Sequence, residues 1–228
     1  MRLAIVSGAD KGIGFEITKQ LAQRGVSVIL TARDPKKGAK AQQDLAAMKL
    51  HVVFHQLDVI DEKSISLLVQ WISKEYGKLD ILVNNAGILL DEGESIGTIS
   101  LDMVRKTMET NFYGPLRLCQ ALLPLLKKSD DGRIVNMSSG LGSLYGGGGG
   151  YPAYSISKTA LNALTVKLAA ELPNMKINCM SPGWVATDMG GKDAPRTPAE
   201  GADTAVWLAT ASDIPSGKFF ENRREIEW

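Results

Sequence analysis

Short apolar segments alternate with amphipathic helical patterns along the chain, and this alternation constrains its fold more than any other feature. Apolar segments typical of buried strands span residues 3–6, 26–30, 51–56, 79–83, 133–137 and 175–180, with a short edge candidate at 217–220. Helical patterns between them span residues 15–22, 35–48, 61–76, 101–128 (broken near Gly114-Pro115), 155–170 and 198–210. Such alternation is typical of βαβ units. We therefore predict an α/β fold, one domain over residues 1–228, whose parallel sheet carries helices on both faces.

The composition predicts an ordinary globular protein. Hydrophobic residues make up 44% of the 228 residues, charged residues make up 22%, and the formal net charge is +1. A nearly neutral chain gives no electrostatic reason to bind nucleic acid or an acidic membrane surface, and no apolar run approaches the length of about 18 residues that spans a bilayer. The opening apolar run is too short for a signal peptide. The two cysteines, Cys119 and Cys179, indicate a reducing compartment, so we expect a cytoplasmic protein.

A glycine-rich turn separates the first strand segment from the first helical pattern. Residues 7–14 read Ser-Gly-Ala-Asp-Lys-Gly-Ile-Gly, which gives the spacing Gly-x3-Gly-x-Gly. Glycines here let the backbone approach a pyrophosphate, and the free N–H groups of the helix start attract its charge. Glycines needed only for close packing are the alternative, but the strand–turn–helix context favours a nucleotide. The predicted cofactor contacts in this turn are Gly8, Asp10, Lys11, Gly12, Ile13 and Gly14.

The end of the second strand segment favours NADP(H) over NAD(H). An acid there would bind the ribose 2′-hydroxyl of NAD, whereas a base would pair with the 2′-phosphate of NADP. The sequence reads Thr31-Ala32-Arg33 and has no acid until Asp34. Arg33 can hold a phosphate in a bidentate fork, and Lys11 can add a second positive charge. Each could instead be a solvated surface cation, but their positions together predict NADPH/NADP as the cofactor.

Tyr154 and Lys158 stand four residues apart at the start of the helical pattern at 155–170, so a helix places them on one face. A free tyrosine has a pKa of about 10, and a nearby cation lowers the pKa of the phenol. The pair therefore predicts a general acid/base. Because such pairs also occur by chance on helix surfaces, the interpretation depends on the rest of the chain.

Further motifs follow the strand segments in order. They are Leu57-Asp58-Val59, Asn84-Asn85-Ala86-Gly87, Asn111, Ser138-Ser139, Tyr154-x3-Lys158, and Ser181-Pro182-Gly183 with Thr187. With these motifs and the glycine turn, the chain resembles the short-chain dehydrogenase/reductase family over nearly its whole length, with Ser7 in place of the family's usual Thr. The resemblance implies a single Rossmann-type doubly wound parallel sheet of about seven strands in the order 3-2-1-4-5-6-7.

The resemblance also implies a catalytic set of Asn111, Ser139, Tyr154 and Lys158. Tyr154 would exchange the proton, Lys158 would assist it and bind the nicotinamide ribose, and Ser139 would hold the substrate oxygen, with Ser138 as the alternative serine. Asn111 would place a water that links Lys158 to solvent. The implied cofactor contacts beyond the glycine turn and Arg33 are Asp58, Val59, Asn85, Ala86, Gly87, Tyr154, Lys158, Pro182, Gly183, Val185 and Thr187.

Within the family, the segments 8–12, 31–34 and 182–189 and the residue Trp228 are most similar to NADPH-dependent carbonyl reductases. Monomeric animal members of that group carry a long insertion between the catalytic serine and tyrosine, whereas 14 residues separate Ser139 from Tyr154 here. Their monomeric state and substrate range therefore do not carry over. Helices near 112–128 and 153–171 commonly pair between subunits in the wider family, so the resemblance implies a homodimer or homotetramer.

The predicted function is reduction of a ketone or aldehyde to an alcohol by hydride transfer from NADPH. Candidate substrate contacts, besides Ser139 and Tyr154, are Leu141, Tyr145, Trp184 and Met189, whose character suggests an apolar or aromatic carbonyl compound. A substrate-side segment is expected near 184–200, and the glycine run 146–150 is either a mobile loop at the site or an ordinary surface loop.

Other functions fit the sequence to different degrees. A non-catalytic NADP(H) sensor or scaffold and an enzyme working as an alcohol dehydrogenase remain open alternatives. His51 and His55 lack carboxylate or cysteine partners, so no metal site is predicted. A Ser-His-Asp hydrolase is disfavoured because the only two histidines, His51 and His55, both lie in a strand-like segment.

Overall fold

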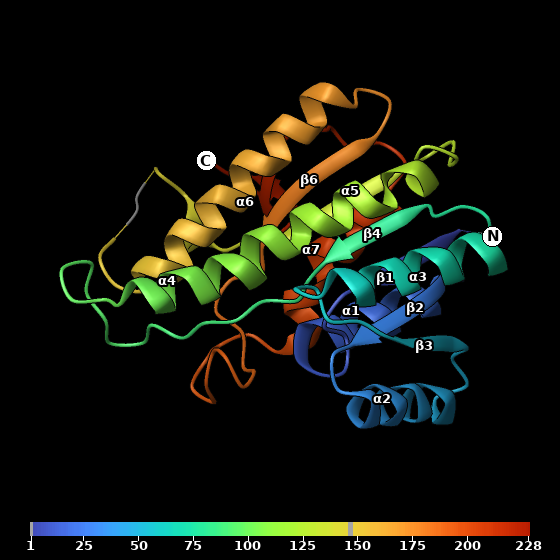
Figure 1. The fold of residues 1–228 in the computed structure, drawn as a ribbon, viewed down its shortest axis with the longest axis horizontal. Coiled ribbons are helices and arrows are strands. Elements are labelled where there is room, and N and C mark those ends of the chain that lie inside the picture. Colours follow the sequence, from blue (N-terminus) through green and yellow to red (C-terminus); the bar gives the residue numbers. More distant parts are fainter. Residues whose placement is uncertain (1, 146–147) are drawn as a thin grey trace.

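The computed structural model describes residues 2–145 and 148–228, and it contains one eight-stranded sheet (Figure 1). The strand order is β3-β2-β1-β4-β5-β6-β7-β8, and every neighbouring pair is parallel except β7 and β8. The predicted order of the first seven strands is confirmed. The eighth strand was not predicted, because two residues that fold back against β7 have no apolar pattern of their own.

The elements alternate as the sequence predicts. The strands are β1 (Leu3–Val6), β2 (Ser27–Ala32), β3 (Val52–Gln56), β4 (Ile81–Asn84), β5 (Arg133–Met137), β6 (Lys176–Ser181), β7 (Phe219–Glu221) and β8 (Arg224–Glu225). The α-helices are α1 (Gly12–Gln23), α2 (Pro35–Ala47), α3 (Glu62–Glu75), α4 (Leu101–Met108), α5 (Gly114–Leu126), α6 (Pro152–Glu171) and α7 (Pro198–Thr210).

The sheet is buried between two layers of helices, each with its own apolar core. Successive strand residues point to opposite faces, so that Ala4 and Val6 of β1 face α1, α2 and α7, whereas Leu3 and Ile5 face α3 and α5. Every residue of β1 is buried. This double coverage explains why the central strands are continuous apolar runs rather than alternating ones.

Several helices begin at residues that the sequence itself supplies as caps. The side chains of Asp34, Asp61 and Ser100 accept hydrogen bonds from first-turn N–H groups of α2, α3 and α4. Thr197 and Glu200 form a reciprocal capping box at the start of α7. These local signals fix the helix starts independently of the tertiary contacts.

The predicted break in the helical region near Gly114 is wrong. A π-helical turn, Glu109–Tyr113, joins α4 to α5, and the chain remains helical through it. Pro115 is tolerated because it lies in the first turn of α5, and Gly114 is needed for packing, since a Cβ there would lie 2.9 Å from the side chain of Val59. The extra residue of a π turn changes the direction of the side chains within it.

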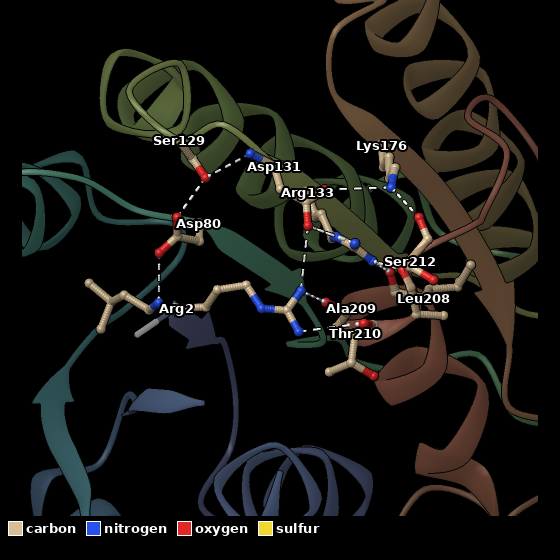
Figure 2. A network of polar contacts seen from close by, with 12 residues as sticks. Arg2, Asp80, Ser129, Asp131, Arg133, Lys176, Leu208, Ala209, Thr210 and Ser212 are labelled. Atoms are coloured by element: carbon tan, nitrogen blue, oxygen red, sulfur yellow. Dashed lines mark hydrogen bonds and ion pairs between the residues drawn. The ribbon is translucent and has the colours of Figure 1, made fainter. Parts of the chain in front are cut away.

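Ionic groups gather where the parallel strands begin. Arg133, at the start of β5, is 2% exposed, and its guanidinium donates two hydrogen bonds to Asp131, at 2.7 and 3.0 Å. It also donates to the carbonyls of Leu208 and Ala211, at 3.0 and 2.7 Å, at the end of α7 (Figure 2). A cation at a helix C-terminus is favourable because the last carbonyls lack partners within the helix.

Neighbouring strands contribute to the same network. Arg2, before β1, donates to the carbonyls of Ala209 and Thr210, and Lys176, at the start of β6, donates to the carbonyl of Ser212 (Figure 2). Asp80, before β4, accepts from Leu3 N at 2.8 Å and from the Ser129 hydroxyl at 2.5 Å. The amino end of the sheet is therefore closed by paired charges and capped carbonyls.

The carboxyl ends of the strands are left for the loops that carry the predicted site. Gly146 and Gly147 of the glycine run fall outside the described residues. Within the described ranges, none of the helices has both the length and the apolar character that a bilayer span requires.

Candidate active site

The glycine turn after β1 forms an open cradle at the start of α1. Lys11 stands at the N-cap position of α1 but makes no capping hydrogen bond with its side chain, and the first turn contains no acidic residue. The first N–H groups of the helix therefore remain available to an anion. Asp10, Gly12 and Ile13 are half-buried along this turn.

Glycine is required in the cradle for steric reasons. Gly8 has a φ of +61°, and a Cβ there would lie 2.9 Å from Cα of Ala86. At Gly14, a Cβ would collide with the side chain of Asn85 and the carbonyl of Gly8. The turn after β1 is thus packed directly against the Asn-Asn-Ala-Gly segment after β4, as a dinucleotide cradle needs.

Two polar side chains hold these segments together. Asn85 Nδ2 donates to the carbonyls of Ser7 and Gly8, both at 2.9 Å. The Ser7 hydroxyl in turn accepts from the backbone N–H groups of Asn85 and Ala86, at 2.9 and 3.0 Å. The amide of Asn85 therefore supports the cradle, and a contact between residues 85–86 and the cofactor stays a prediction.

The two charged residues after β2 differ in how free their side chains are. Arg33 is exposed, whereas the side chain of Asp34 accepts hydrogen bonds from Lys36 N and Lys37 N, at 2.8 and 3.2 Å. These backbone hydrogen bonds, with the nearby lysine charges, lower the pKa of Asp34. The first acid after β2 is thus committed to capping α2. Lys11, the second cation predicted to bind the cofactor, forms an exposed ion pair with Asp188 of the segment after β6.

Three further predicted contacts pack around the site. Asp58, after β3, is half-buried and its carboxylate accepts from Ile60 N at 3.2 Å, while Val59 is buried against Gly114. Gly87 lies between two catalytic candidates, because a Cβ there would lie 3.4 Å from Asn111 Oδ1 and 3.6 Å from Lys158 Nζ.

Tyr154 and Lys158 both lie on α6 and are buried, with exposed fractions of 8% and 4%. The Lys158 ammonium lies 5.5 Å from the centroid of the Tyr154 ring and donates to the carbonyl of Met137 at 2.6 Å. Burial disfavours the charged form of each group, and it lowers the pKa of Lys158 to about 8.

The pKa of Tyr154 moves in the opposite direction from the predicted one. Burial raises the pKa of Tyr154 to about 12, the hydrogen bond from Ser139 lowers it, and the charge of Asp91 raises it further. The expectation that Lys158 lowers the Tyr154 pKa is wrong for this arrangement, because desolvation dominates and Lys158 is not among the groups that shift this pKa. The phenol is therefore protonated at neutral pH.

The structure separates the two candidate serines. Ser138 is buried, and its hydroxyl is hydrogen-bonded to Asn162 Oδ1 at 2.5 Å, so it belongs to the interior. Ser139 is half-buried, stands at the start of a 3₁₀ turn, and lies close enough to Tyr154 to lower the pKa of its phenol. Ser139 is thus the serine nearer the phenol, and its catalytic role stays a prediction.

Asn111 lies in the π-helical turn and is fully buried. Its side chain accepts from Ile88 N at 2.8 Å and donates to the Ile88 carbonyl at 2.9 Å and to the Ser157 hydroxyl at 3.0 Å. It therefore joins the segment after β4 to α6. These contacts do not test whether Asn111 also places a water beside Lys158, so that role stays a prediction.

The segment after β6 crosses the glycine turn. Gly183 has a φ of +73° and packs against Arg196, and a backbone bridge pairs Val185 with Arg196. Thr187 lies over the cradle, since a Cβ on Gly12 would come within 3.4 Å of its methyl group. Thr187 therefore lies next to the cradle, and contacts of Pro182, Gly183, Val185 and Thr187 with the cofactor stay predictions.

The four candidate substrate side chains are all exposed. The exposed fractions are 38% for Leu141, 74% for Tyr145, 58% for Trp184 and 45% for Met189. The indole of Trp184 donates to the carbonyl of Gly190 at 2.7 Å. Their common role in a substrate pocket stays a prediction.

Sequence reasoning missed Asp91, which lies between β4 and α4 and contacts the start of α6. One indirect signal was present. Pro152 begins the helical pattern without a serine, threonine, aspartate or asparagine just before it, so the helix needs a cap from elsewhere. The sequence also gave no sign of the role of Ser157, whose hydroxyl donates to the Tyr154 carbonyl at 2.7 Å.

The sheet and the glycine cradle define a dinucleotide-binding protein of the Rossmann type. A family model described as short chain dehydrogenase matches residues 2–197. The chain is 34% identical to (+)-neomenthol dehydrogenase of Arabidopsis thaliana, over 100% of this chain and 98% of that protein. It is 36% identical to carbonyl reductase (NADPH) 1 of Bos taurus, over 99% of this chain and 98% of that protein.

A solved structure agrees with these relatives. The NADPH-bound carbonyl reductase from chicken fatty liver superposes with a TM-score of 0.89 at 31% identity, covering 100% of both chains. The chain belongs to the short-chain dehydrogenase family, and it is an oxidoreductase that uses a nicotinamide cofactor. The alignment with the cattle protein runs over 275 residues, although this chain has 228, so the relative carries insertions that this chain lacks.

Proposed function

We propose that this protein is an NADPH-dependent carbonyl reductase that converts a ketone or aldehyde into an alcohol. The observation that carries the proposal is the buried phenol of Tyr154, which has the Lys158 ammonium 5.5 Å from its ring centroid and Ser139 close enough to lower its pKa. The names of the similar reductases from cattle and chicken agree with it.

The chain's own residues handle the proton and the carbonyl oxygen. The nicotinamide supplies the hydride when it is bound. Tyr154 donates its proton to the carbonyl oxygen as negative charge develops there, and Ser139 stabilises that charge by a hydrogen bond. Lys158, whose pKa is lowered to about 8, is mostly protonated at neutral pH and favours the phenolate that remains.

The pKa of Tyr154 supports reduction over alcohol oxidation. With a pKa raised to about 12, the side chain is a proton donor at neutral pH. Alcohol oxidation needs the phenolate, which is scarce until the pH approaches that value. Reduction is therefore the direction that this site favours in neutral solution.

The choice of NADPH rests on the end of β2. Arg33 is exposed there, Lys11 lies across the cradle, and the carboxylate of Asp34 is occupied in capping α2. A 2′-phosphate would meet two cations and no free acid from residues 31–34. We propose that Arg33 binds the 2′-phosphate, and that Lys11 leaves its ion pair with Asp188 and pairs with the phosphate instead.

The remaining parts of the proposal concern surroundings and assembly. The substrate is a small apolar or aromatic carbonyl compound that contacts the segment 184–200, and the protein acts in the cytoplasm as a homodimer or homotetramer. Residues 1–228 would act as one domain. A panel assay with ketones, aldehydes and quinones, followed by NADPH absorbance, identifies the substrate class.

Replacement of Tyr154 by Phe tests the chemistry. We expect Y154F to lower turnover by about 10³-fold, within the range for general acid catalysis, while NADPH binding, measured by fluorescence titration, changes less than twofold. Tyr151→Phe is the matched control, because Tyr151 precedes the same helix and has no capping side-chain contact. Full activity of Y154F would contradict the mechanism. If the wild-type protein binds NADPH but turns over none of the tested substrates, a sensor or scaffold is favoured instead.

A further inference from the structure

Asp91 is a buried carboxylate that the proposed mechanism does not use. It lies between β4 and α4, more than sixty residues before α6, and its exposed fraction is 0%. Its Oδ2 accepts hydrogen bonds from Ala153 N at 2.7 Å and from Tyr154 N at 3.2 Å. Its Oδ1 is also buried and has no hydrogen-bond partner among the described residues. A buried carboxylate with an unsatisfied oxygen is unfavourable, so its presence here calls for a physical explanation.

The helix that carries Tyr154 has no cap of its own. Tyr151, at the N-cap position, has a φ of +48° and makes no capping hydrogen bond with its side chain, and Pro152 has no N–H. The next two N–H groups of the helix, those of Ala153 and Tyr154, donate to the Asp91 carboxylate. The Ser155 N–H donates to the Tyr151 carbonyl at 2.8 Å. Asp91 therefore performs from a distant loop the function that Asp61 performs locally for α3.

The same carboxylate is close enough to Tyr154 to act on its charge. Asp91 raises the pKa of Tyr154, whereas Lys158, on α6, lies 5.5 Å from the ring centroid. Cys179, from β6, faces Lys158 and is protonated, because burial raises the pKa of its thiol. Asp91 is thus the negative group facing the phenol, and Lys158 is the positive one.

We propose that Asp91 is a positioning residue of the active site, which fixes the first turn of α6 and acts electrostatically on the phenol of Tyr154. The inference rests on the proposed function, since it concerns the residue that donates the proton. A carboxylate satisfies the helix N-terminus better than a neutral cap. Its charge also disfavours the phenolate and so maintains the proton donor.

The direct test is an NMR titration of protein labelled with ¹³C at tyrosine Cζ, with the Tyr154 signal assigned from Y154F. Asp91→Asn retains an oxygen that can cap the helix but removes the charge. We expect D91N to shift the Tyr154 titration to lower pH by about one unit, as expected for loss of a nearby like charge. Asp61→Asn is the matched control, because it makes the same change at the cap of α3 and should leave the titration unchanged. Equal titrations in the wild type, D91N and D61N would overturn the proposal.

Kinetics give a second measurement. In alcohol oxidation with NADP, the rise of kcat with pH should move to lower pH in D91N, and Asp91→Glu should restore it toward the wild-type position. Asp91→Ala, which also removes the cap, should lower kcat for reduction about tenfold with KM for NADPH within twofold, because the glycine cradle is untouched. An equal fall of kcat in D91N and D91A without any pH shift would leave Asp91 a purely structural cap and overturn the proposal.

The two measurements separate the inference from the proposed function. Absence of turnover in the wild type on the whole substrate panel would contradict the proposed function, and the NMR titration would still decide the role of Asp91. If D91N does not fold, Asp91→Glu carries the NMR test, because it keeps the charge and should leave the Tyr154 titration within about half a unit of the wild type. A larger shift in D91E would overturn the proposal.

Discussion

The two ends of the same parallel sheet are built from different chemistry. At the amino end, Arg133 and Asp131 form a paired, hydrogen-bonded network that also satisfies the last carbonyls of α7 (Figure 2). At the carboxyl end, α1 begins without a side-chain cap, and Lys158 and Asp91 are buried without an ion-pair partner among the described residues. Both ends bury charge, but only the amino end neutralises it.

The difference between the two ends shows that buried charge stabilises the fold at the amino end of the sheet and destabilises it at the carboxyl end. Cations at the C-terminus of α7 complement the helix dipole, so the charges at the amino end stabilise the native state. A buried lysine whose pKa is lowered to about 8 is disfavoured as an ammonium and therefore destabilises the fold at neutral pH. Groups with perturbed pKa values of this kind cluster at sites of chemistry.

Replacement of Arg133 by Met should have the largest effect on stability. The variant removes the donors to the carbonyls of Leu208 and Ala211 and a partner of Asp131, and we expect the free energy of unfolding to fall by about 3 kcal/mol. Urea denaturation measures the fall. The kcat of the folded fraction should stay unchanged, because the site lies at the other end of the sheet.

Arg223→Met is the control for this comparison. Arg223 also pairs with an aspartate, Asp203, but both side chains are substantially exposed. Surface pairs of this kind contribute about 1 kcal/mol or less, so R223M should be much less destabilising than R133M. Equal losses in the two variants would show that the amino-end network is no more important than a surface ion pair.

Replacement of Lys158 by Met should have the opposite sign. Lowering a lysine pKa from 10.5 to about 8 corresponds to a destabilisation on the order of 3 kcal/mol. Since the variant also leaves the Met137 carbonyl without this donor, we expect a net gain of about 1 to 3 kcal/mol in the free energy of unfolding at pH 7, with loss of turnover. Lys167→Met, at an exposed position of the same helix, should change neither quantity appreciably.

The pH dependence of that gain has a defined sign. The folded form of Lys158 titrates near 8 and the unfolded form near 10.5, so the destabilisation is complete below pH 8 and disappears as the pH rises to about 10.5. The stability difference between K158M and the wild type should therefore shrink across this window. A difference that is constant from pH 7 to 10 would mean that burial does not perturb this ammonium.

Replacement of Arg33 by Ala should have the smallest effect and should be confined to the cofactor. We expect the KM for NADPH to rise about tenfold, the scale of one charge-assisted contact, and the KM for NADH to change less than twofold. Arg24→Ala, an exposed arginine beyond the end of α1, is the control. Equal changes for the two cofactors would mean that Arg33 does not contact a 2′-phosphate.

The sequence by itself determined the alternation of strands and helices, because runs such as residues 3–6 are too apolar to lie anywhere but between two helical layers. It also determined the glycine turn, whose Gly8 adopts a positive φ. Local caps such as Asp34 fixed the helix starts. All of these depend on interactions between residues close in sequence or on the period of the apolar pattern.

Only the tertiary structure decided the electrostatics of the site. The direction of the Tyr154 pKa depends on burial and on Asp91, which is distant in sequence. The helix continues through Glu109–Tyr113, where the Asn111 side chain is hydrogen-bonded to Ile88 and Ser157 of other segments. Desolvation depends on which distant atoms surround a group, and no pattern of neighbouring residues encodes that. The sequence therefore identified the groups that could do the chemistry, and the fold set their charge.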